Sequence, residues 1–239
     1  MEDGDILFID EIHRLNKLIE EVLYPAMEDF VLDIVIGKGP SARTLRLNLP
    51  RFTLIGATTR IGLLTSPLLN RFGSTFHLNF YAEDDIQKIL KRSSGLLGID
   101  IDSEAIKTVS RSARATPRIA NRLLKRVRDY AEVKNSGTIT KDIAEKAFKM
   151  LEIDNLGLEP TDRMILEIII NKFSGGPVGI QTIAAASHED EDTISDIYEP
   201  YLLQIGFLAR SMKGRIATKD AYAHLGIPFA ENQNQGTLL

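Results

Sequence analysis

The chain has 239 residues, of which 44% are hydrophobic and 26% charged, which is the balance of a globular protein with room for two or three small domains. No apolar run approaches the roughly 18 residues needed to cross a membrane, no secretory leader precedes the first apolar run, and the absence of cysteine excludes disulfides and thiolate metal sites. The net charge of −4 argues against a surface that coats nucleic acid throughout, so any DNA contact must come from a local basic patch. We expect a cytoplasmic protein with no contact to a membrane.

The opening stretch, 4–11, has the pattern of a strand that ends in two acids. Four apolar residues lie between a glycine and two carboxylates, which is typical of a strand buried on both faces of a parallel sheet. Chemistry collects at the carboxyl ends of such strands, where Asp10 and Glu11 fall. In P-loop nucleotide hydrolases a carboxylate here helps to hold Mg²⁺, and the next acid activates water. The alternative is a strand that ends in a charged turn.

A helix and a hairpin follow. Apolar residues at helical spacing predict a helix over 16–29, with Asn16 as N-cap and a kink or break near Pro25. Over 31–49 the period changes to two around a turn-rich loop, which predicts a β-hairpin. Its apolar side chains favour a surface for a partner over a decorative insertion. These side chains are Ile34, Ile36, Leu45 and Leu47.

A second predicted strand, 52–57, ends in two hydroxyl residues. Thr58 and Thr59 are placed to hydrogen-bond a phosphate or a water. A short helix then leads to Arg71, which stands before an aromatic residue and a glycine. Arg71 is a candidate for reaching the nucleotide of a neighbouring subunit, and the alternative is an arginine that only solvates its helix. The four histidines show no metal-ligand spacing, so we expect them to be structural or surface groups.

From 83 to 151 the pattern is helical throughout. We expect four helices, the second capped by Ser103, the third beginning near Pro117 and the fourth following Thr140. Residues 111–135 hold eight Lys or Arg against two acids, which on composition alone predicts a solvated basic face. Arg118 differs because it stands at a helix start, where backbone amides also favour anions.

Residues 155–157 have the composition of a linker, and the region after them predicts three short helices and a two-stranded wing. This order describes a winged-helix domain. Its second and third helices carry a run of acids that would repel phosphates, so we do not expect sequence-specific reading by the third helix. The wing offers three cations for phosphate contacts, which position a protein on DNA without reading sequence. These cations are Arg210, Lys213 and Arg215.

Five stretches in this order resemble the RuvB family, the bacterial AAA+ motors of Holliday-junction branch migration. They are 7–15 (LFIDEIHRL), 23–30 (LYPAMEDF), 36–43 (IGKGPSAR), 56–60 (GATTR) and 116–122 (TPRIANR). The resemblance implies an α/β fold: a partial AAA+ P-loop core with a parallel sheet, an inserted β-hairpin, a helical lid and a C-terminal winged-helix domain. The expected boundaries are 1–82 for the core, 83–156 for the lid, 157–227 for the winged helix and 228–239 for a disordered tail.

The resemblance also implies an activity and its partners. A hexameric ring would encircle double-stranded DNA at a four-way junction and couple ATP hydrolysis to its movement, in recombination, DNA repair and the SOS response. RuvA would dock on hairpin 31–49, and RuvC would join the same assembly. The implied cofactors are ATP and Mg²⁺.

Site roles are carried over position by position. Asp10 matches the Walker B residue that supports Mg²⁺, Glu11 the acid that activates water, and Thr59 the sensor of the γ-phosphate. Arg71 matches the arginine finger given to the next subunit's ATP, and Arg118 matches the second sensor, on the lid. Further nucleotide-contacting matches are Tyr81 and the triplet Glu28, Asp29 and Phe30, and the wing arginines Arg210 and Arg215 match DNA contacts.

One family motif has no counterpart in these residues. The P-loop, G-x-x-x-x-G-K-[ST], should precede the Walker B strand by roughly fifty residues, but only three residues precede Gly4. We therefore expect an N-terminally incomplete copy, a fragment or a truncated reading frame, which alone neither binds ATP tightly nor moves DNA. Micromolar ATP affinity would refute this. Smaller departures, at Leu69 and at Ser74-Thr75, bear on subunit contacts.

Two other functions fit some of the same residues. A clamp-loader-type AAA+ ATPase shares the Walker B acids, the sensors and the finger, but the winged helix and the hairpin disfavour it. A winged-helix DNA-binding regulator with a remnant ATPase core is disfavoured by the acidic third helix. It is also disfavoured by the joint presence of Glu11, Thr59, Arg71 and Arg118.

Overall fold

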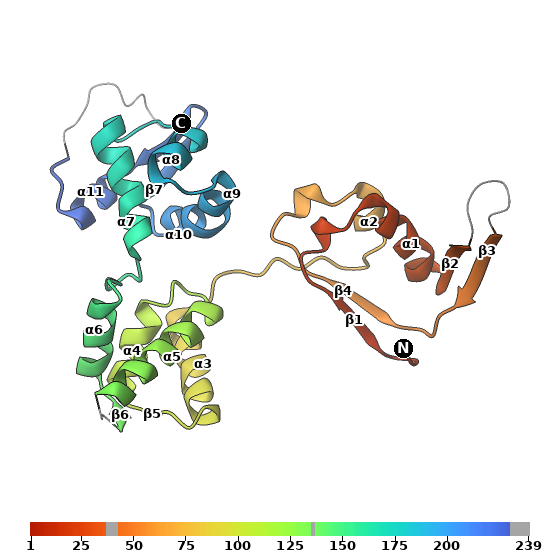
Figure 1. The fold of residues 1–239 in the computed structure, drawn as a ribbon, viewed down its shortest axis with the longest axis horizontal. Coiled ribbons are helices and arrows are strands. Elements are labelled where there is room, and N and C mark those ends of the chain that lie inside the picture. Colours follow the sequence, from red (N-terminus) through yellow and green to blue (C-terminus); the bar gives the residue numbers. More distant parts are fainter. Residues whose placement is uncertain (37–42, 135–136, 230–239) are drawn as a thin grey trace. The chain divides into compact units, whose positions relative to one another are not determined.

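A computed structural model describes residues 1–36, 43–134 and 137–229 (Figure 1). The chain forms two compact units, Met1–Leu78 and Asn79–Leu239, here called unit 1 and unit 2. The tip of the predicted hairpin and the predicted tail from 230 onward lie outside the described residues. In the described part of the chain, no helix combines the length and the apolar character that crossing a membrane requires.

Unit 1 contains a pair of parallel strands, β1 (Ile6–Ile9) and β4 (Thr53–Gly56), in register from the Ile6–Thr53 pair to the Ile9–Gly56 pair. The parallel pairing confirms the predicted sheet type. The prediction that the opening strand is buried on both faces is wrong, because Ile6 and Phe8 are 65% and 58% exposed. In the described residues β1 pairs with β4 alone, and nothing covers the face that carries these two side chains.

Helix α1 (Lys17–Glu28) follows a 3₁₀ turn at Ile12–Arg14. Asn16 caps it as predicted, since its Oδ1 accepts a hydrogen bond of 2.9 Å from the Ile19 amide. The helix is not broken at Pro25. A proline removes only one backbone donor, and Asp29 closes the last turn by donating to the Pro25 carbonyl at 2.9 Å.

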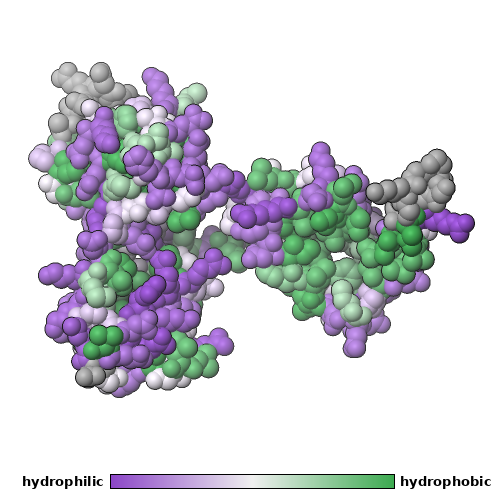
Figure 2. Space-filling model, viewed as in Figure 1, coloured by the Kyte–Doolittle hydropathy of each residue, from purple (hydrophilic) through white to green (hydrophobic). Residues whose placement is uncertain are grey.

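The hairpin joins β2 (Val31–Ile36) and β3 (Arg43–Asn48) in antiparallel register and confirms the predicted element. One face exposes the four predicted apolar side chains at 38–56%: Ile34, Ile36, Leu45 and Leu47. On the other face Arg46 donates two hydrogen bonds, of 2.8 and 2.9 Å, to the Asp33 carboxylate, and these hold the pKa of Asp33 below its usual range. Figure 2 shows hydrophobic residues gathered on the region of β2 and β3.

A short second helix completes unit 1. After a 3₁₀ turn at Ile61–Leu63, α2 (Ser66–Leu69) is capped by Thr65, whose hydroxyl lies 3.4 Å from the Leu68 amide. Leu68 is fully buried, so it anchors α2 in the interior of unit 1. Arg71 stands two residues beyond the end of α2.

The first half of unit 2 is a helical domain, as predicted. Its helices are α3 (Glu83–Leu96), α4 (Ser103–Arg111), α5 (Pro117–Val133) and α6 (Lys141–Met150). Asp102, rather than the predicted Ser103, caps α4, because its carboxylate accepts from the Ala105 amide at 2.6 Å. Two parallel strands too short for a sequence signal, β5 (Asp100–Ile101) and β6 (Thr138–Ile139), lie beside α3–α6.

The second half of unit 2 is a winged-helix domain. Its helical segments are α7 (Pro160–Glu167), which continues as a π-helix over Ile168–Lys172, α8 (Ile180–Ser187), α9 (Glu191–Thr193), a π-helix over Ile194–Tyr198, and α10 (Glu199–Gln204). The wing pairs β7 (Leu208–Ser211) with β8 (Gly214–Ala217). An unpredicted helix, α11 (Lys219–Leu225), follows. Disorder predicted from 228 is wrong at Phe229, whose ring packs 5.0 Å from that of Tyr222.

The predicted linker at 155–157 is packed rather than free. A Cβ on Gly157 (φ +77°) would lie 2.2 Å from the Ser112 carbonyl, so only glycine fits there. The Leu156 carbonyl accepts a hydrogen bond of 2.6 Å from the Tyr201 hydroxyl. The segment is therefore fixed on one side to the helical domain and on the other to the winged helix.

Candidate active site

The structure brings together Glu11 and Thr59, two of the predicted catalytic residues. They follow β1 and β4, which run parallel, so their side chains emerge at the same edge of the sheet. The Thr59 hydroxyl donates to Glu11 Oε2 at 3.2 Å, and the Thr59 amide donates to the same oxygen at 3.4 Å. Glu11 has a left-handed backbone (φ +47°), a strained conformation that concentrates at functional sites. The pair can hold one carboxylate ready to accept a proton.

His13 is a member of this cluster that the sequence did not reveal. Its Nδ1 lies 2.8 Å from the Thr58 hydroxyl and 3.1 Å from Glu11 Oε2, and only 8% of its side chain is exposed. A histidine two residues beyond an acid gives no recognisable metal or catalytic pattern. Only the turn at Ile12–Arg14 brings the ring back to the ends of both strands.

Asp10 supplies a further carboxylate at the same edge. Its Oδ1 accepts a hydrogen bond of 3.0 Å from the Glu11 amide, and the residue is exposed. Carboxylate and hydroxyl oxygens are the donors that Mg²⁺ takes from proteins, usually from one or two carboxylates together with substrate phosphates. Asp10, Glu11 and Thr59 therefore fit a magnesium–nucleotide complex by donor chemistry. No preformed cage of three or more metal-binding side chains exists among the described residues.

Arg71 belongs to a second cluster, built on α1 and α2. Its guanidinium lies over the Tyr24 ring, 4.3 Å from the centroid, and Nη1 donates to the Pro67 carbonyl at 2.8 Å. Nε is 3.1 Å from Glu28 Oε1 but lacks the angle of a hydrogen bond to it. The side chain is 22% exposed, so it is partly covered by its own protomer while one edge still reaches solvent. The structure thus places Glu28 and Arg71, both predicted nucleotide contacts, side by side.

The turn after α1 places Asp29 and Phe30, which together with Glu28 form the predicted nucleotide-contacting triplet. Asp29 ends the helix, and Phe30 takes a left-handed backbone (φ +54°) that sends the chain into β2. The Phe30 ring packs edge-on against Phe52 at 5.9 Å. A cavity of about 120 Å³ has Phe30 and Arg71 in its lining.

Tyr81, a predicted nucleotide contact within the expected core boundary of 1–82, and Arg118 of the predicted lid both belong to unit 2. The Tyr81 amide donates to the Ala115 carbonyl at 3.1 Å, which ties Tyr81 to the loop before α5. Arg118 is in the first turn of that helix, is exposed, and forms no ion pair within the described ranges. A guanidinium with free donors beside helix-terminal amides can bind an anion.

The three wing cations differ in how exposed they are and in their hydrogen bonds to Glu199. Glu199 is 1% exposed, and its carboxylate accepts two hydrogen bonds, of 2.9 and 3.0 Å, from Arg215 and one of 2.9 Å from Arg210. Burial raises the pKa of Glu199, but these hydrogen bonds more than offset that effect and leave the pKa below its usual value. Arg215 is only 19% exposed and Arg210 is 59% exposed, while Lys213 is exposed at the tip. Arg215 is therefore mainly a partner of Glu199.

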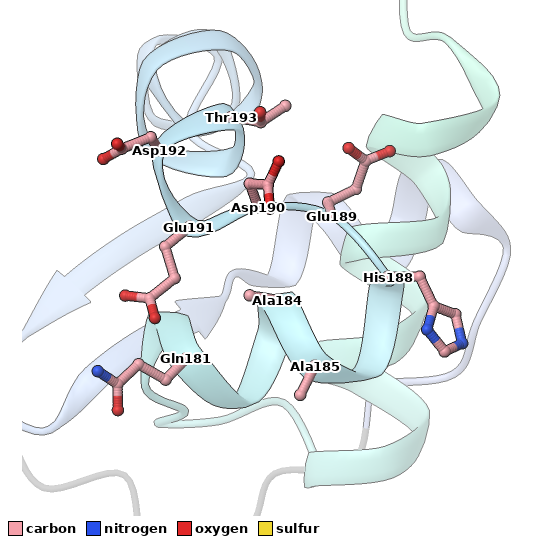
Figure 3. A pocket seen from close by; sticks show the side chains of 9 residues that line it. All are labelled: Gln181, Ala184, Ala185, His188, Glu189, Asp190, Glu191, Asp192 and Thr193. Carbon is pink, nitrogen blue, oxygen red and sulfur yellow. The ribbon is translucent and has the colours of Figure 1, made fainter.

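The helix that would enter a DNA groove is acidic, as the sequence indicates. A hollow of about 840 Å³ between α8 and α9 is lined by four carboxylates, and Figure 3 shows them around it: Glu189, Asp190, Glu191 and Asp192. Negative charge of this density repels phosphates. The acids of this region therefore leave the prediction that DNA phosphates contact the wing unchanged.

Three family models match consecutive parts of the chain. They describe the Holliday junction DNA helicase RuvB P-loop domain (residues 1–78), the RuvB AAA lid domain (81–154) and the RuvB C-terminal winged helix domain (155–226). A solved structure of Thermotoga maritima RuvB, described as a Holliday junction branch migration motor, is 46% identical with a TM-score of 0.83. The match covers 96% of this chain and 72% of that one. The chain belongs to the RuvB family.

Relatives that are named as RuvB subunits of the Holliday junction branch migration complex support the same family membership. The subunit of Dehalococcoides mccartyi is 59% identical over 230 residues, and that of Chloroflexus aurantiacus 58% identical over 231 residues. These matches cover 96% and 97% of this chain but 66% of each relative, so the chain spans slightly less than two thirds of their length. The predicted fold class is confirmed: a RuvB P-loop domain with parallel strands, a lid and a winged helix.

Proposed function

We propose that this chain is the motor subunit of Holliday-junction branch migration, an ATP hydrolase that moves double-stranded DNA during recombination and repair. The observation that carries the proposal is the contact between Glu11 and Thr59 at the carboxyl edge of β1 and β4, within a RuvB P-loop domain. Neither a clamp loader nor a regulator is supported by the lid and winged-helix matches, which are those of RuvB.

Glu11 is the proposed base of the reaction. Its carboxylate orients the attacking water and takes the proton as the water oxygen bonds to the γ-phosphorus and the bond to the leaving phosphate oxygen breaks. The Thr59 hydroxyl donates to Glu11 Oε2 in the structure, so it fixes the direction in which that carboxylate points. His13 Nδ1 also lies 3.1 Å from the same oxygen. Such positioning is the main protein contribution to phosphoryl transfer.

Asp10 would hold Mg²⁺, which supplies charge neutralisation at the phosphates when it is bound. Tyr81 and Arg118 of the lid would contact the nucleotide of the same protomer. Arg71, with the triplet Glu28, Asp29 and Phe30, would face the nucleotide of the next protomer in a hexameric ring. This division follows from the family resemblance and from the exposed edge of Arg71.

The partners follow from the exposed surfaces. The apolar face of the β2–β3 hairpin is a proposed docking site for RuvA, and RuvC joins the same assembly at the four-way junction. The wing, through Lys213 and Arg210, is the proposed contact to duplex phosphates. The protein acts in the cytoplasm, as part of the SOS response to DNA damage.

The test of this function uses an extended chain, in which these 239 residues follow the P-loop segment of a RuvB relative. With RuvA and ATP, we expect the extended chain to convert a synthetic four-way junction into two duplexes. Glu11→Gln should abolish hydrolysis and migration while ATP still binds, and Glu21→Gln, an exposed acid of α1, should change neither. Undiminished migration by Glu11→Gln, or no migration by the unmodified extended chain, would contradict the proposal.

Lys213→Ala should weaken duplex binding of the chain uniformly across DNA sequences. Because one phosphate contact is lost, the slope of log K against log salt should fall in magnitude by about 1. Fluorescence anisotropy with labelled duplexes at several salt concentrations measures this. Lys219→Ala, which removes an exposed lysine of α11, is the control and should leave the slope unchanged. An unchanged slope for Lys213→Ala would remove the wing tip from the DNA contact.

A further inference from the structure

One face of α1 is directed entirely at the segment that carries Arg71. Glu20, Tyr24 and Glu28 are spaced four residues apart, so they lie in a row on the same side of the helix. Each of the three contacts a residue of the segment 65–71. The roles proposed above use Glu28 alone from this row.

Glu20 is the buried end of the row. Its exposed fraction is 5%, although a carboxylate is costly to bury unless hydrogen bonds compensate it. The Thr65 hydroxyl donates to Glu20 Oε2 at 2.7 Å, and the Tyr24 hydroxyl donates to the same oxygen at 3.1 Å. Tyr24 Oη and Thr65 Oγ1 are also 3.3 Å apart. One buried acid therefore fixes both the ring of Tyr24 and the residue that caps α2.

Tyr24 is the platform for Arg71. With its hydroxyl bound to Glu20, the ring presents one face to the guanidinium, whose Cζ is 4.3 Å from the ring centroid. The backbone of Arg71 is held as well, because its amide donates to the Leu68 carbonyl at 3.1 Å. Within the part of the chain that the structure describes, Nη2 of Arg71 has no hydrogen-bond partner, so this edge of the guanidinium is free to donate to a phosphate oxygen.

We propose that Tyr24, anchored by Glu20 and Thr65, is a positioning residue that orients the Arg71 guanidinium toward the phosphates of a neighbouring protomer's nucleotide. The inference rests on the proposed role of Arg71 as a finger. An unsupported arginine loses side-chain entropy when it is fixed. A ring that holds the guanidinium beforehand reduces this loss at the moment of hydrolysis. Tyr24 itself does not touch the nucleotide.

Three variants of the extended chain test the role of the ring. Tyr24→Leu removes the platform and should lower kcat for ATP hydrolysis by about 3- to 30-fold with little change in KM. Tyr24→Phe keeps the ring but loses the hydroxyl that binds Glu20, so its kcat should lie between those of the unmodified extended chain and Tyr24→Leu. In an Arg71→Ala background, Tyr24→Leu should cause no further loss, because there is no guanidinium left to orient. A full additional loss in that background would show a general structural effect and overturn the proposal.

Glu20 is tested by a matched pair. Glu20→Gln weakens the anchor of Tyr24 and Thr65 and should lower kcat in the same direction as Tyr24→Leu. Glu21→Gln changes the neighbouring exposed acid of α1 and should leave kcat unchanged. Equal effects of the two substitutions would contradict a specific role for Glu20.

A second measurement separates this inference from the role of Arg71 in hydrolysis. In the 239-residue chain, the ¹H–¹⁵N signal of the Arg71 side-chain Nε–H, assigned by its loss in Arg71→Ala, should be shifted by the ring of Tyr24. Tyr24→Leu should move it to the position of a free arginine, whereas Tyr24→Phe, which keeps the ring without its anchor, should move it only part of the way. If Tyr24→Leu leaves the position of the signal unchanged, the Tyr24 ring does not hold the Arg71 guanidinium, and the proposal is wrong. If the signal moves but Arg71→Ala hydrolyses ATP normally, the proposed role of Arg71 in hydrolysis is wrong, while the Tyr24 ring still holds the guanidinium.

Discussion

Arg71→Ala should lower ATP hydrolysis by the extended chain by roughly 10³- to 10⁵-fold, the range measured for arginine fingers. The expected loss is large because the guanidinium offsets charge that develops on the transferred phosphoryl group. Arg71→Lys should recover little, since an ammonium lacks the planar fork of donors that binds two phosphate oxygens together. Steady-state phosphate release with excess ATP measures both variants.

The control for this prediction is Arg92→Ala, which removes an exposed arginine of α3. It alters net charge by the same amount as Arg71→Ala and should leave hydrolysis unchanged. A loss below tenfold for Arg71→Ala would show that the contacts of Arg71 with Tyr24, Glu28 and Pro67 are its whole function.

Asp162→Ala should destabilise the chain by about 3–5 kcal/mol, the cost of leaving a buried charge without its partner. Asp162 is fully buried, and its carboxylate accepts from both Nη atoms of Arg114, which is 6% exposed. Burial raises the pKa of Asp162, although the charge of Arg114 opposes that rise. Arg114 also donates to the Gly157 carbonyl at 2.7 Å. The pair therefore fastens the helical domain to the winged helix, and urea denaturation of the 239-residue chain measures its contribution.

Asp142→Ala is the matched control for Asp162→Ala. Asp142 also lies in the first turn of a helix and pairs with Lys146, but it is 68% exposed, so its loss should cost at most about 1 kcal/mol. Replacing both buried partners, with Arg114→Met and Asp162→Leu together, should restore part of the lost stability because no unpaired charge remains. Equal urea midpoints for Asp162→Ala and Asp142→Ala would contradict the assigned importance of the buried pair.

The sequence predicted elements whose signals are local. The helices of the lid, the hairpin at 31–49 and the wing follow from periodicity and turn residues, and all are present. Asn16 was recognisable as a cap from its place before an apolar repeat. Strands of two residues, β5 and β6, could not be predicted because a period cannot be read from so short a run.

Features that depend on tertiary contacts were not predictable. Ile6 and Phe8 have the pattern of a doubly buried strand, yet their exposure depends on what packs beside β1. In the sequence Glu199 is one of a run of acids on the second and third predicted helices of the winged helix, whereas in the structure its carboxylate is buried and binds both wing arginines. Tyr24 and Glu20 lie more than forty residues from Thr65 and Arg71, so their cluster exists only once α1 and α2 are packed together.

The most direct test of a site shared between protomers is a mixing experiment with the extended chain. Glu11→Gln and Arg71→Ala variants, each inactive alone, are combined in equal amounts and allowed to assemble. If Arg71 serves the neighbouring nucleotide, sites with an intact Glu11 from one variant receive Arg71 from the other, and hydrolysis should reappear well above the sum of the two separate rates. A mixture no more active than that sum, in assemblies shown to contain both variants, would contradict the shared site.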